Sequence, residues 1–89
     1  MTAVPRSVLI VDDEEGIRQS LSSILREEGY AAESVASGEE CLEAAKRRAY
    51  DLVLLDIWLK GMDGLETLRH LNELARPPVV VVISGHATI

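Results

Sequence analysis

Three aspartates in this sequence directly follow apolar runs, a placement that suits the binding of a divalent cation. Asp12 and Asp13 come after residues 8–11, and Asp56 comes after residues 52–55. Like charges held close together raise one another's pKa unless a cation compensates them. All-oxygen ligands select a hard divalent ion, and a site with few protein ligands and several waters suits Mg²⁺. The three carboxylates are therefore candidate magnesium ligands.

The same residues could carry phosphoryl chemistry. Neither of the glycine-rich phosphate-binding motifs, GxGxxG and GxxxxGK[ST], occurs in the sequence, so a phosphoryl group would approach the acidic residues through the metal. A carboxylate could then attack phosphorus in line. Ser84 brings a hydroxyl after the apolar residues 79–83, although it could instead cap a helix. Glu14 and Glu15 are interpreted as helix N-terminal acids, and His86 as a local or solvent-facing group.

Four apolar runs rich in β-branched residues are predicted to be the strands that position these side chains. They are residues 7–11, 30–35, 52–55 and 79–83. All but the second are continuous rather than alternating, which is typical of strands covered on both faces. In a parallel sheet the ligands bind beyond the carboxyl ends of the strands, where the three aspartates are expected to meet.

The segments between the strands have the period of amphipathic helices. Ser37 and Glu40 form a capping box for the second helix, while Arg18 and Arg26 fall on the solvent side of the first. The apolar stripes are Ile17, Leu21, Ile24 and Leu25; Cys41, Leu42, Ala45 and Ala49; and Leu65, Leu68, Leu71, Leu74 and Ala75. The alternation predicts an α/β fold, a doubly wound parallel sheet with right-handed crossovers.

Composition narrows the class of protein. The chain has 89 residues, is 47% hydrophobic but only 3% aromatic, and carries a net charge of −6. This composition predicts one domain with an aliphatic core. The negative charge argues against direct contact with nucleic acid. No membrane-spanning run or signal peptide is recognised, so a cytoplasmic protein is expected. Cys41, the only cysteine, is expected to be a buried hydrophobe.

Taken in order, these motifs resemble the receiver domain of two-component response regulators. The resemblance rests on Asp12 and Asp13 after the first strand, Asp56 after the third, the Gly-Met-Asp-Gly sequence at 61–64, and Ser84 after the fourth strand. It covers nearly all of the chain. It implies a flavodoxin-like receiver fold with the strand order 2-1-3-4 in this chain.

The resemblance also implies a role for each matching residue. Asp56 would be the phospho-acceptor, receiving a phosphoryl group from a sensor histidine kinase. Asp13, Asp56 and the backbone carbonyl of Trp58 would bind Mg²⁺ directly, with Asp12 helping through water. Ser84 would be the switch hydroxyl that turns toward the phosphoryl oxygen. Such a domain is not an enzyme beyond catalysing phosphorylation and dephosphorylation of its own aspartate.

By the same resemblance, the receiver would switch an attached or downstream output domain, here expected to regulate transcription. The Ser-Gly-His-Ala sequence at 84–87 is similar to receivers of nitrogen-regulation-type activators, which work with sigma-54. A degenerate receiver that acts only as a protein-interaction module is the alternative. A metal-dependent phosphohydrolase is disfavoured, because its D-x-D-x-[TV] motif is not matched at residues 56–60.

Two features depart from the receiver pattern. Lys60 stands where receivers usually have proline. Residues 1–89 are expected to form a C-terminally truncated receiver without the last β-α unit and its lysine, which pairs with the phosphoryl group. Residues 79–83 would then be an exposed apolar edge, and we expect self-association through it.

Overall fold

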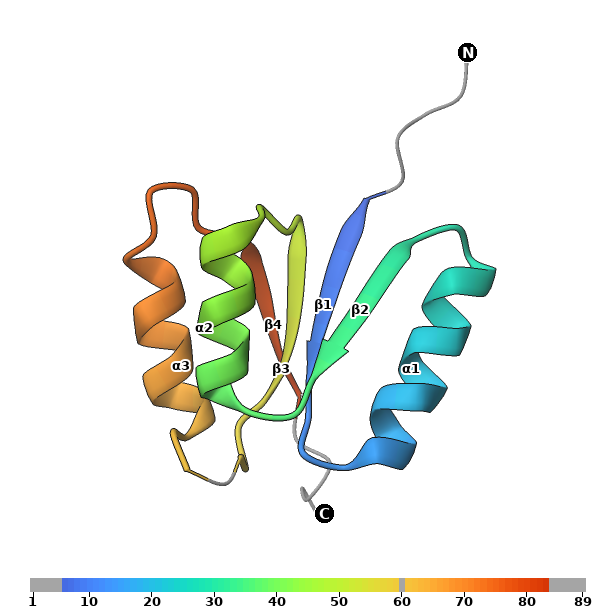
Figure 1. Ribbon diagram of the computed structural model, residues 1–89, viewed down its shortest axis with the longest axis horizontal. Helices are drawn as coiled ribbons and strands as arrows, with labels where there is room; N and C mark the ends of the chain where they lie inside the picture. The colour runs from blue at the N-terminus through green and yellow to red at the C-terminus, as the bar shows by residue number, and fades with distance from the viewer. Residues whose placement is uncertain (1–5, 60, 84–89) are drawn as a thin grey trace.

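The computed structural model of the chain describes residues 6–59 and 61–83, which alternate strand and helix (Figure 1). The elements are β1 (Ser7–Val11), α1 (Glu15–Glu27), β2 (Ala31–Val35), α2 (Gly38–Arg47), β3 (Leu52–Asp56), α3 (Gly64–Asn72) and β4 (Val79–Ile83). All strand pairs are parallel and the sheet order is β2-β1-β3-β4. The predicted fold class and strand order are confirmed.

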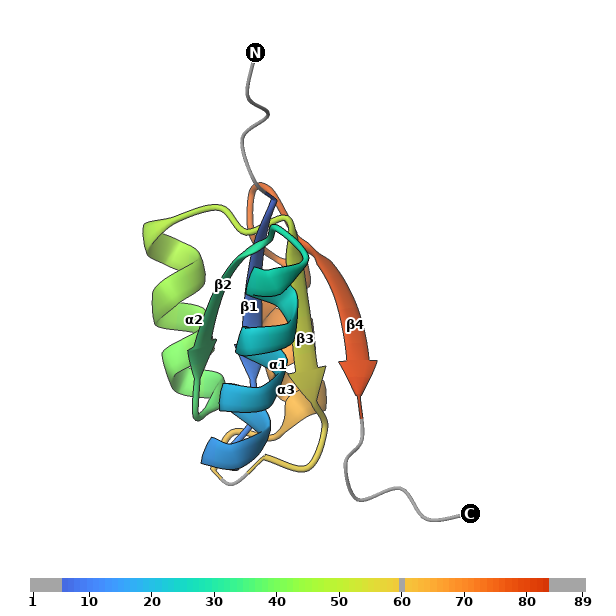
Figure 2. The same cartoon turned by 90° about the vertical axis from the view of Figure 1, so that its right-hand side faces the viewer.

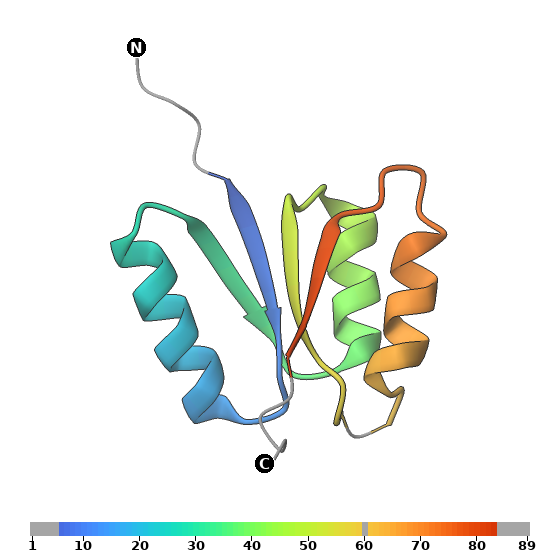
Figure 3. The same ribbon diagram turned by 180° about the vertical axis from the view of Figure 1, so that it is seen from behind.

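The sheet separates two apolar clusters, because successive side chains of a strand point to opposite faces. In Figure 3, α1 lies on one face, and α2 and α3 lie together on the other. The larger cluster lies under α2 and α3 and includes Leu9, Val53 and Leu71, all fully buried. The smaller cluster lies under α1 and includes Val8 and Ile10. The continuous apolar run of β1 is thus covered on both faces, as predicted.

The starts of α2 and α3 are fixed by side-chain caps. Ser37 Oγ accepts a hydrogen bond from the Glu40 N–H at 3.1 Å, and Glu40 Oε1 accepts one from the Ala36 N–H at 2.8 Å. The predicted capping box is therefore present, except that Glu40 accepts from the N–H of Ala36, the residue before the cap, and not from that of Ser37. Asp63 Oδ1 accepts from the Glu66 N–H at 2.7 Å at the start of α3. Such caps satisfy N–H groups that have no partner within the helix.

The buried face of α3 differs from the predicted stripe. Leu65 is 65% exposed, whereas Thr67 is fully buried. A Cβ on Gly64 would lie 2.4 Å from the Ile57 Cα, so the helix starts in close backbone contact with the loop after β3. Thr67 Oγ1 donates to the Asp63 carbonyl at 2.9 Å, which satisfies the hydroxyl inside the protein. This close packing decides which side of α3 is buried, and the apolar period does not reveal it.

Strand β4 is more exposed than its continuous apolar run predicts. The exposed fractions are 66% for Val79 and 44% for both Val81 and Val82. Figure 2 shows α1 in front of the central strands, with β4 beyond it at one side. β4 is an edge strand of the described sheet, in agreement with the expectation of an exposed edge. In the described part of the chain, no helix is long and apolar enough to cross a membrane.

Candidate metal centre

The three aspartates predicted to meet are brought together by the register of β1 and β3. These strands are parallel neighbours, and Val11 pairs with Leu55, so their carboxyl ends are level. Asp12, Asp13 and Asp56 each place one carboxylate oxygen within 4.8 Å of the others. Asp12 and Asp13 directly follow β1, and Asp56 is the last residue of β3. The carboxyl ends of these two strands lie at the lower end of the sheet in Figure 1.

Asp12 is buried and is held by hydrogen bonds to its side chain and to its backbone carbonyl. It is 1% exposed, and its Oδ1 accepts a hydrogen bond from the Glu14 N–H at 2.9 Å. Its backbone carbonyl accepts from Arg18 Nη1 at 2.7 Å. Burial raises the pKa of Asp12, the Glu14 N–H lowers it, and the charges of Asp56, Asp13 and Glu14 raise it further. The net pKa is raised, because desolvation and like charges both disfavour the ionised form.

Asp56 has a similar local geometry. It is the last residue of β3, is 1% exposed, and its Oδ1 accepts from the Trp58 N–H at 3.0 Å. Asp12 and Asp56 therefore each use one carboxylate oxygen to hold the turn that follows them. Within the described residues, the second oxygen of each accepts no recorded hydrogen bond. One carboxylate oxygen of each lies within 4.8 Å of an oxygen of Asp13.

The donor set fits a hard divalent cation. Three carboxylates from two adjacent turns converge, and two of them are almost fully buried. Burying like charges side by side is unfavourable unless an opposite charge offsets their repulsion. Oxygen-only ligands favour Mg²⁺ or a related ion over softer metals. The acidic cluster can therefore bind a metal.

The remaining predicted site residues are placed less fully. Trp58 is 58% exposed, and its carbonyl as a metal ligand stays a prediction. Ser84, His86 and Lys60 lie outside the described residues. The contact of Arg18 with the Asp12 carbonyl was not predicted, because the helical period places Arg18 on the solvent side of α1. One feature could have indicated this contact: Arg18 is a cation near the start of a helix, where the helix dipole favours acidic residues.

Comparison with protein families supports the resemblance found in the sequence. Residues 8–89 match the family model described as the response regulator receiver domain. Over 84 residues the chain is 42% identical to a putative NtrX-like response regulator from Rickettsia bellii, covering 92% of this chain and 18% of that protein. It is 39% identical over 83 residues to the sensory transduction protein RegX3 from Mycolicibacterium smegmatis, covering 93% and 36%.

Solved structures give the same result. A CheY-like response regulator receiver domain from Methylobacillus flagellatus superposes with a TM-score of 0.87 at 30% identity, covering 92% of this chain and 71% of that one. NtrX from Brucella abortus superposes with a TM-score of 0.85 at 39% identity, covering 93% and 19%. The chain thus spans less than two fifths of the curated relatives named above, and about seven tenths of the CheY-like domain.

Proposed function

This chain belongs to the response regulator receiver domain family, and on that premise we propose that it accepts a phosphoryl group on Asp56 from a sensor histidine kinase. Members of this family are signalling modules. The observation that carries the proposal is the convergence of the Asp12, Asp13 and Asp56 carboxylates beyond β1 and β3. Phosphoryl transfer needs a positioned nucleophile and neutralisation of charge, and this cluster supplies sites for both.

In this proposal each acidic residue has its own task. Asp13, Asp56 and the Trp58 carbonyl hold Mg²⁺ directly, and Asp12 does so through water. Bound there, Mg²⁺ supplies neutralisation of the charge on the phosphoryl oxygens. The Trp58 N–H fixes one oxygen of Asp56 and so orients the other. That second oxygen forms the bond to phosphorus while the phosphorus–nitrogen bond to the kinase histidine breaks, and the electron pair of that bond returns to the imidazole.

The signal would pass to an output domain that regulates transcription. A relative in Bacillus subtilis, 36% identical over 75 residues, is the transcriptional regulatory protein ResD. The NtrX-like relatives support the nitrogen-regulation subgroup, and with it the proposed link to sigma-54. Ser84 remains the proposed switch hydroxyl. We also propose a cytoplasmic location, no membrane or direct nucleic-acid contact, and no catalysis beyond turnover of the phosphoryl group on Asp56.

The extent of the domain is a further part of the proposal. We treat residues 1–89 as a receiver whose last β-α unit is not included in this chain. Coverage supports this assignment, since the chain spans 71% and 69% of two structures of receiver domains, those of Methylobacillus flagellatus and Methanospirillum hungatei.

For the 89-residue chain itself, we propose self-association through β4. The Val79 N–H donates toward β3, and the Ile83 carbonyl accepts from beyond it, each at 3.2 Å. Because main-chain groups alternate in a parallel ladder, Val80 and Val82 direct theirs away from the sheet. A second copy pairing antiparallel about Val81 places Val80 opposite the other copy's Val82. Each such pair can exchange both of its main-chain hydrogen bonds.

Phosphorylation is tested with a small phosphodonor. The chain is incubated with Mg²⁺ and acetyl phosphate, and intact-mass spectrometry is expected to show the addition of one phosphoryl group. Asp56→Asn should abolish the addition, while Glu43→Gln, an exposed carboxylate-to-amide change on α2, should keep it. An unmodified wild type would contradict the proposal and favour an interaction-only module. Sustained turnover of phosphomonoesters would indicate a phosphohydrolase.

Metal binding has an independent readout in Trp58. It is the single tryptophan of the chain, and its backbone N–H donates to the Asp56 carboxylate. Titration with Mg²⁺ is expected to change its fluorescence. Asp13→Asn should weaken the apparent affinity by at least about tenfold, a loss that outer partners of a metal site can already cause. Equal affinity in the wild type and in Asp13→Asn would remove Asp13 from the ligand set.

A further inference from the structure

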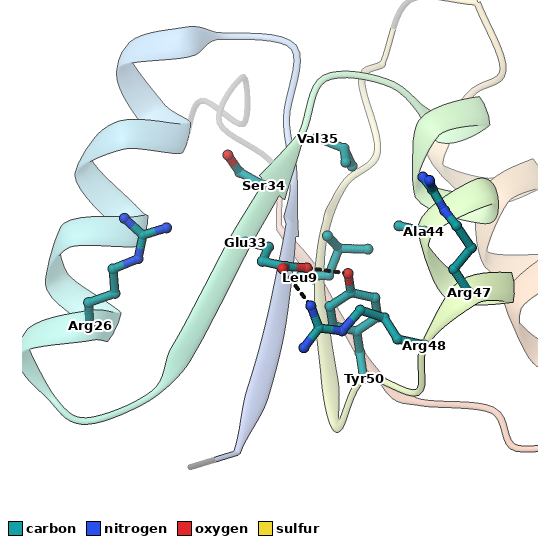
Figure 4. Close-up of a pocket in the computed structure, with 9 residues that line it drawn as sticks. All are labelled: Leu9, Arg26, Glu33, Ser34, Val35, Ala44, Arg47, Arg48 and Tyr50. Carbon is teal, nitrogen blue, oxygen red and sulfur yellow. Dashed lines mark hydrogen bonds and ion pairs between the residues drawn. The ribbon is translucent and has the colours of Figure 1, made fainter.

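A groove between β2 and α2 lies apart from the acidic cluster. Its volume is about 630 Å³, and its lining combines apolar surface from Val35 and Ala44 with the side chains of three arginines. Figure 4 shows Arg26 on one side of β2, and Arg47 and Arg48 on the other. The edge of β2 therefore runs between two sets of positive charge.

The hydrogen bonds at the two ends of β2 show which main-chain groups face outward. The Ala31 N–H donates to the carbonyl preceding β1 at 2.9 Å, and the Val35 carbonyl accepts from the N–H following β1 at 3.2 Å. Since these groups alternate along a parallel strand, Ala32 and Ser34 direct their N–H and C=O groups away from the sheet. This outer edge is where another strand could pair.

Side chains occupy the two ends of this outer edge but not its middle. The Ala32 carbonyl accepts from Arg26 Nη2 at 2.8 Å and from Arg26 Nε at 3.3 Å. Just beyond the strand, the Ala36 N–H donates to Glu40 Oε1 at 2.8 Å. Ser34 faces outward by this alternation, and among the described residues no loop or side-chain hydrogen bond is made to its N–H or C=O. Ser34 therefore presents both groups that a ladder pair requires.

The groove is positively charged on a negatively charged protein. Three arginines and Glu33 line it, a formal charge of +2, whereas the whole chain carries −6. Glu33 is already engaged, because its carboxylate accepts from Arg48 Nη1 at 2.6 Å and from the Tyr50 hydroxyl. Arg26 is bonded to a neutral carbonyl, and Arg47 forms no ion pair among the described residues. Neither Arg26 nor Arg47 is held in an ion pair within the described residues, so both can pair with an acidic partner, although Glu39, Glu40 and Glu43 line an adjoining pocket with Arg47.

We propose that the outer edge of β2 binds an extended acidic peptide segment as an added strand. The segment pairs with the main chain of Ser34. Its successive side chains point to opposite faces, so neighbouring acidic residues reach Arg26 on one side and Arg47 on the other. An apolar side chain next along the segment can enter the groove beside Val35 and Ala44. This site is separate from the phosphoryl site and does not depend on Asp56.

The charge and the main-chain geometry together select this partner. A long polyanion such as nucleic acid would be repelled by the rest of the acidic surface. A small inorganic anion could bind the arginines, but it would not pair with the main chain of Ser34. A second copy of the chain would pair there without any added peptide. These other occupants are distinguished by the experiment below.

The test uses the 89-residue chain and a labelled peptide of sequence VEEVEEV, with VKKVKKV as the matched control. Fluorescence anisotropy is expected to show binding of the acidic peptide alone. Arg47→Glu should weaken binding about tenfold, a change of about 1.4 kcal/mol. Arg69→Glu, the same change on the exposed side of α3, should leave it unchanged. Equal binding to both variants would overturn the proposal.

Main-chain pairing is tested at Ser34. Proline is tolerated in edge strands where the N–H faces solvent, so Ser34→Pro removes the outward donor without breaking a bond to β1, and circular dichroism checks its fold. This variant should lose peptide binding, and Ser34→Ala should retain it. Amide hydrogen exchange should slow at Ser34 when VEEVEEV is added. Several outcomes would overturn the proposal: unchanged exchange at Ser34, full displacement of the peptide by millimolar inorganic phosphate, or a peptide-free dimer that protects Ser34.

Discussion

The two edge strands of the described sheet both direct main-chain groups outward, but one carries polar side chains and the other only apolar ones. β2 and β4 each have five residues, and each directs a row of main-chain groups away from the sheet. β2 reads AAESV and includes two polar side chains, and its edge is partly covered by Arg26 and Glu40. β4 reads VVVVI and has no such cover among the described residues. β2 thus has the composition of a strand at a solvent edge, and β4 that of an interior strand.

The neighbouring helices explain why only one edge is covered. α1 packs against β2 and α2 begins beside its end, so long side chains from both helices reach its outer main chain. Over β4, Val79 and Val81 remain 66% and 44% exposed. Unpaired main-chain groups next to exposed valines favour pairing with another strand. A covered edge limits this pairing to partners that match its charge.

The largest expected difference between the two edges is in self-association. Val81→Lys should convert the self-associated chain into a monomer, because the proposed pairing places two lysines directly opposite each other. Ser34→Lys, the equivalent change on β2, should leave the association unchanged. Sedimentation velocity at several concentrations measures both variants. A wild type that stays monomeric, or a Val81→Lys variant that still associates, would remove the proposed role of the β4 edge.

The sequence predicted most of what positions these edges and the acidic cluster. β1 and β4 have the expected bounds, because apolar runs there are bordered by polar residues or by proline. The meeting of Asp12, Asp13 and Asp56 was predictable, since carboxyl ends of neighbouring parallel strands share one edge of the sheet.

The contacts made by long side chains were not predictable in this way. The helical period assigned Arg18 and Arg26 to the solvent side of α1, yet each donates to a backbone carbonyl outside the helix. Periodicity indicates the direction of a Cβ, but a guanidinium lies several bonds further away. The burial of Thr67 instead of Leu65 was missed for a related reason, because close backbone approach at Gly64 sets the rotation of α3.

The next largest effect is expected from removing the cover of the β2 edge. Arg26→Ala leaves the Ala32 carbonyl without its side-chain donor. The free energy of unfolding should fall by about 1.5 kcal/mol, the lower end of the range for hydrogen bonds to charged groups. Urea denaturation measures the change. Arg69→Ala on α3 is the control and should change stability by less than about 0.5 kcal/mol. Equal losses in the two variants would show that the Arg26 contact does not stabilise the edge.

The contact between Tyr50 and Glu33 gives the β2 side a dependence on pH that β4 lacks. Burial, the hydrogen bond to Glu33 and the charge of Glu33 raise the pKa of Tyr50 from 10.0 to about 12. The folded state therefore keeps the phenol proton that the unfolded chain loses first. The stabilisation is complete below pH 10 and is lost as the pH rises to about 12.

Tyr50→Phe tests this contribution. The variant should be about 1 kcal/mol less stable at neutral pH, the usual net value of one hydrogen bond. The difference from wild type should shrink between pH 10 and 12, because only the wild type loses this stabilisation there. Tyr30→Phe, which alters a tyrosine that is 39% exposed, should show neither effect. A difference that stays constant over this pH range would contradict the assignment to Tyr50.

The smallest effect is expected at Glu40, where charge and hydrogen bonding can be separated. Glu40→Gln keeps an oxygen that can accept from the Ala36 N–H but removes the charge beside the start of α2. A charge at a helix N-terminus contributes about 0.3–1 kcal/mol, so a loss near 0.5 kcal/mol is expected at low salt, and a smaller one at high salt. Glu40→Ala should lose about 1 kcal/mol, because it removes the acceptor as well. A Glu40→Gln variant as stable as the wild type at both salt concentrations, beside a destabilised Glu40→Ala variant, would show that charge contributes nothing to this end of the β2 edge. Its cover would then depend on geometry alone, and the contrast with β4 would rest on hydrogen bonding.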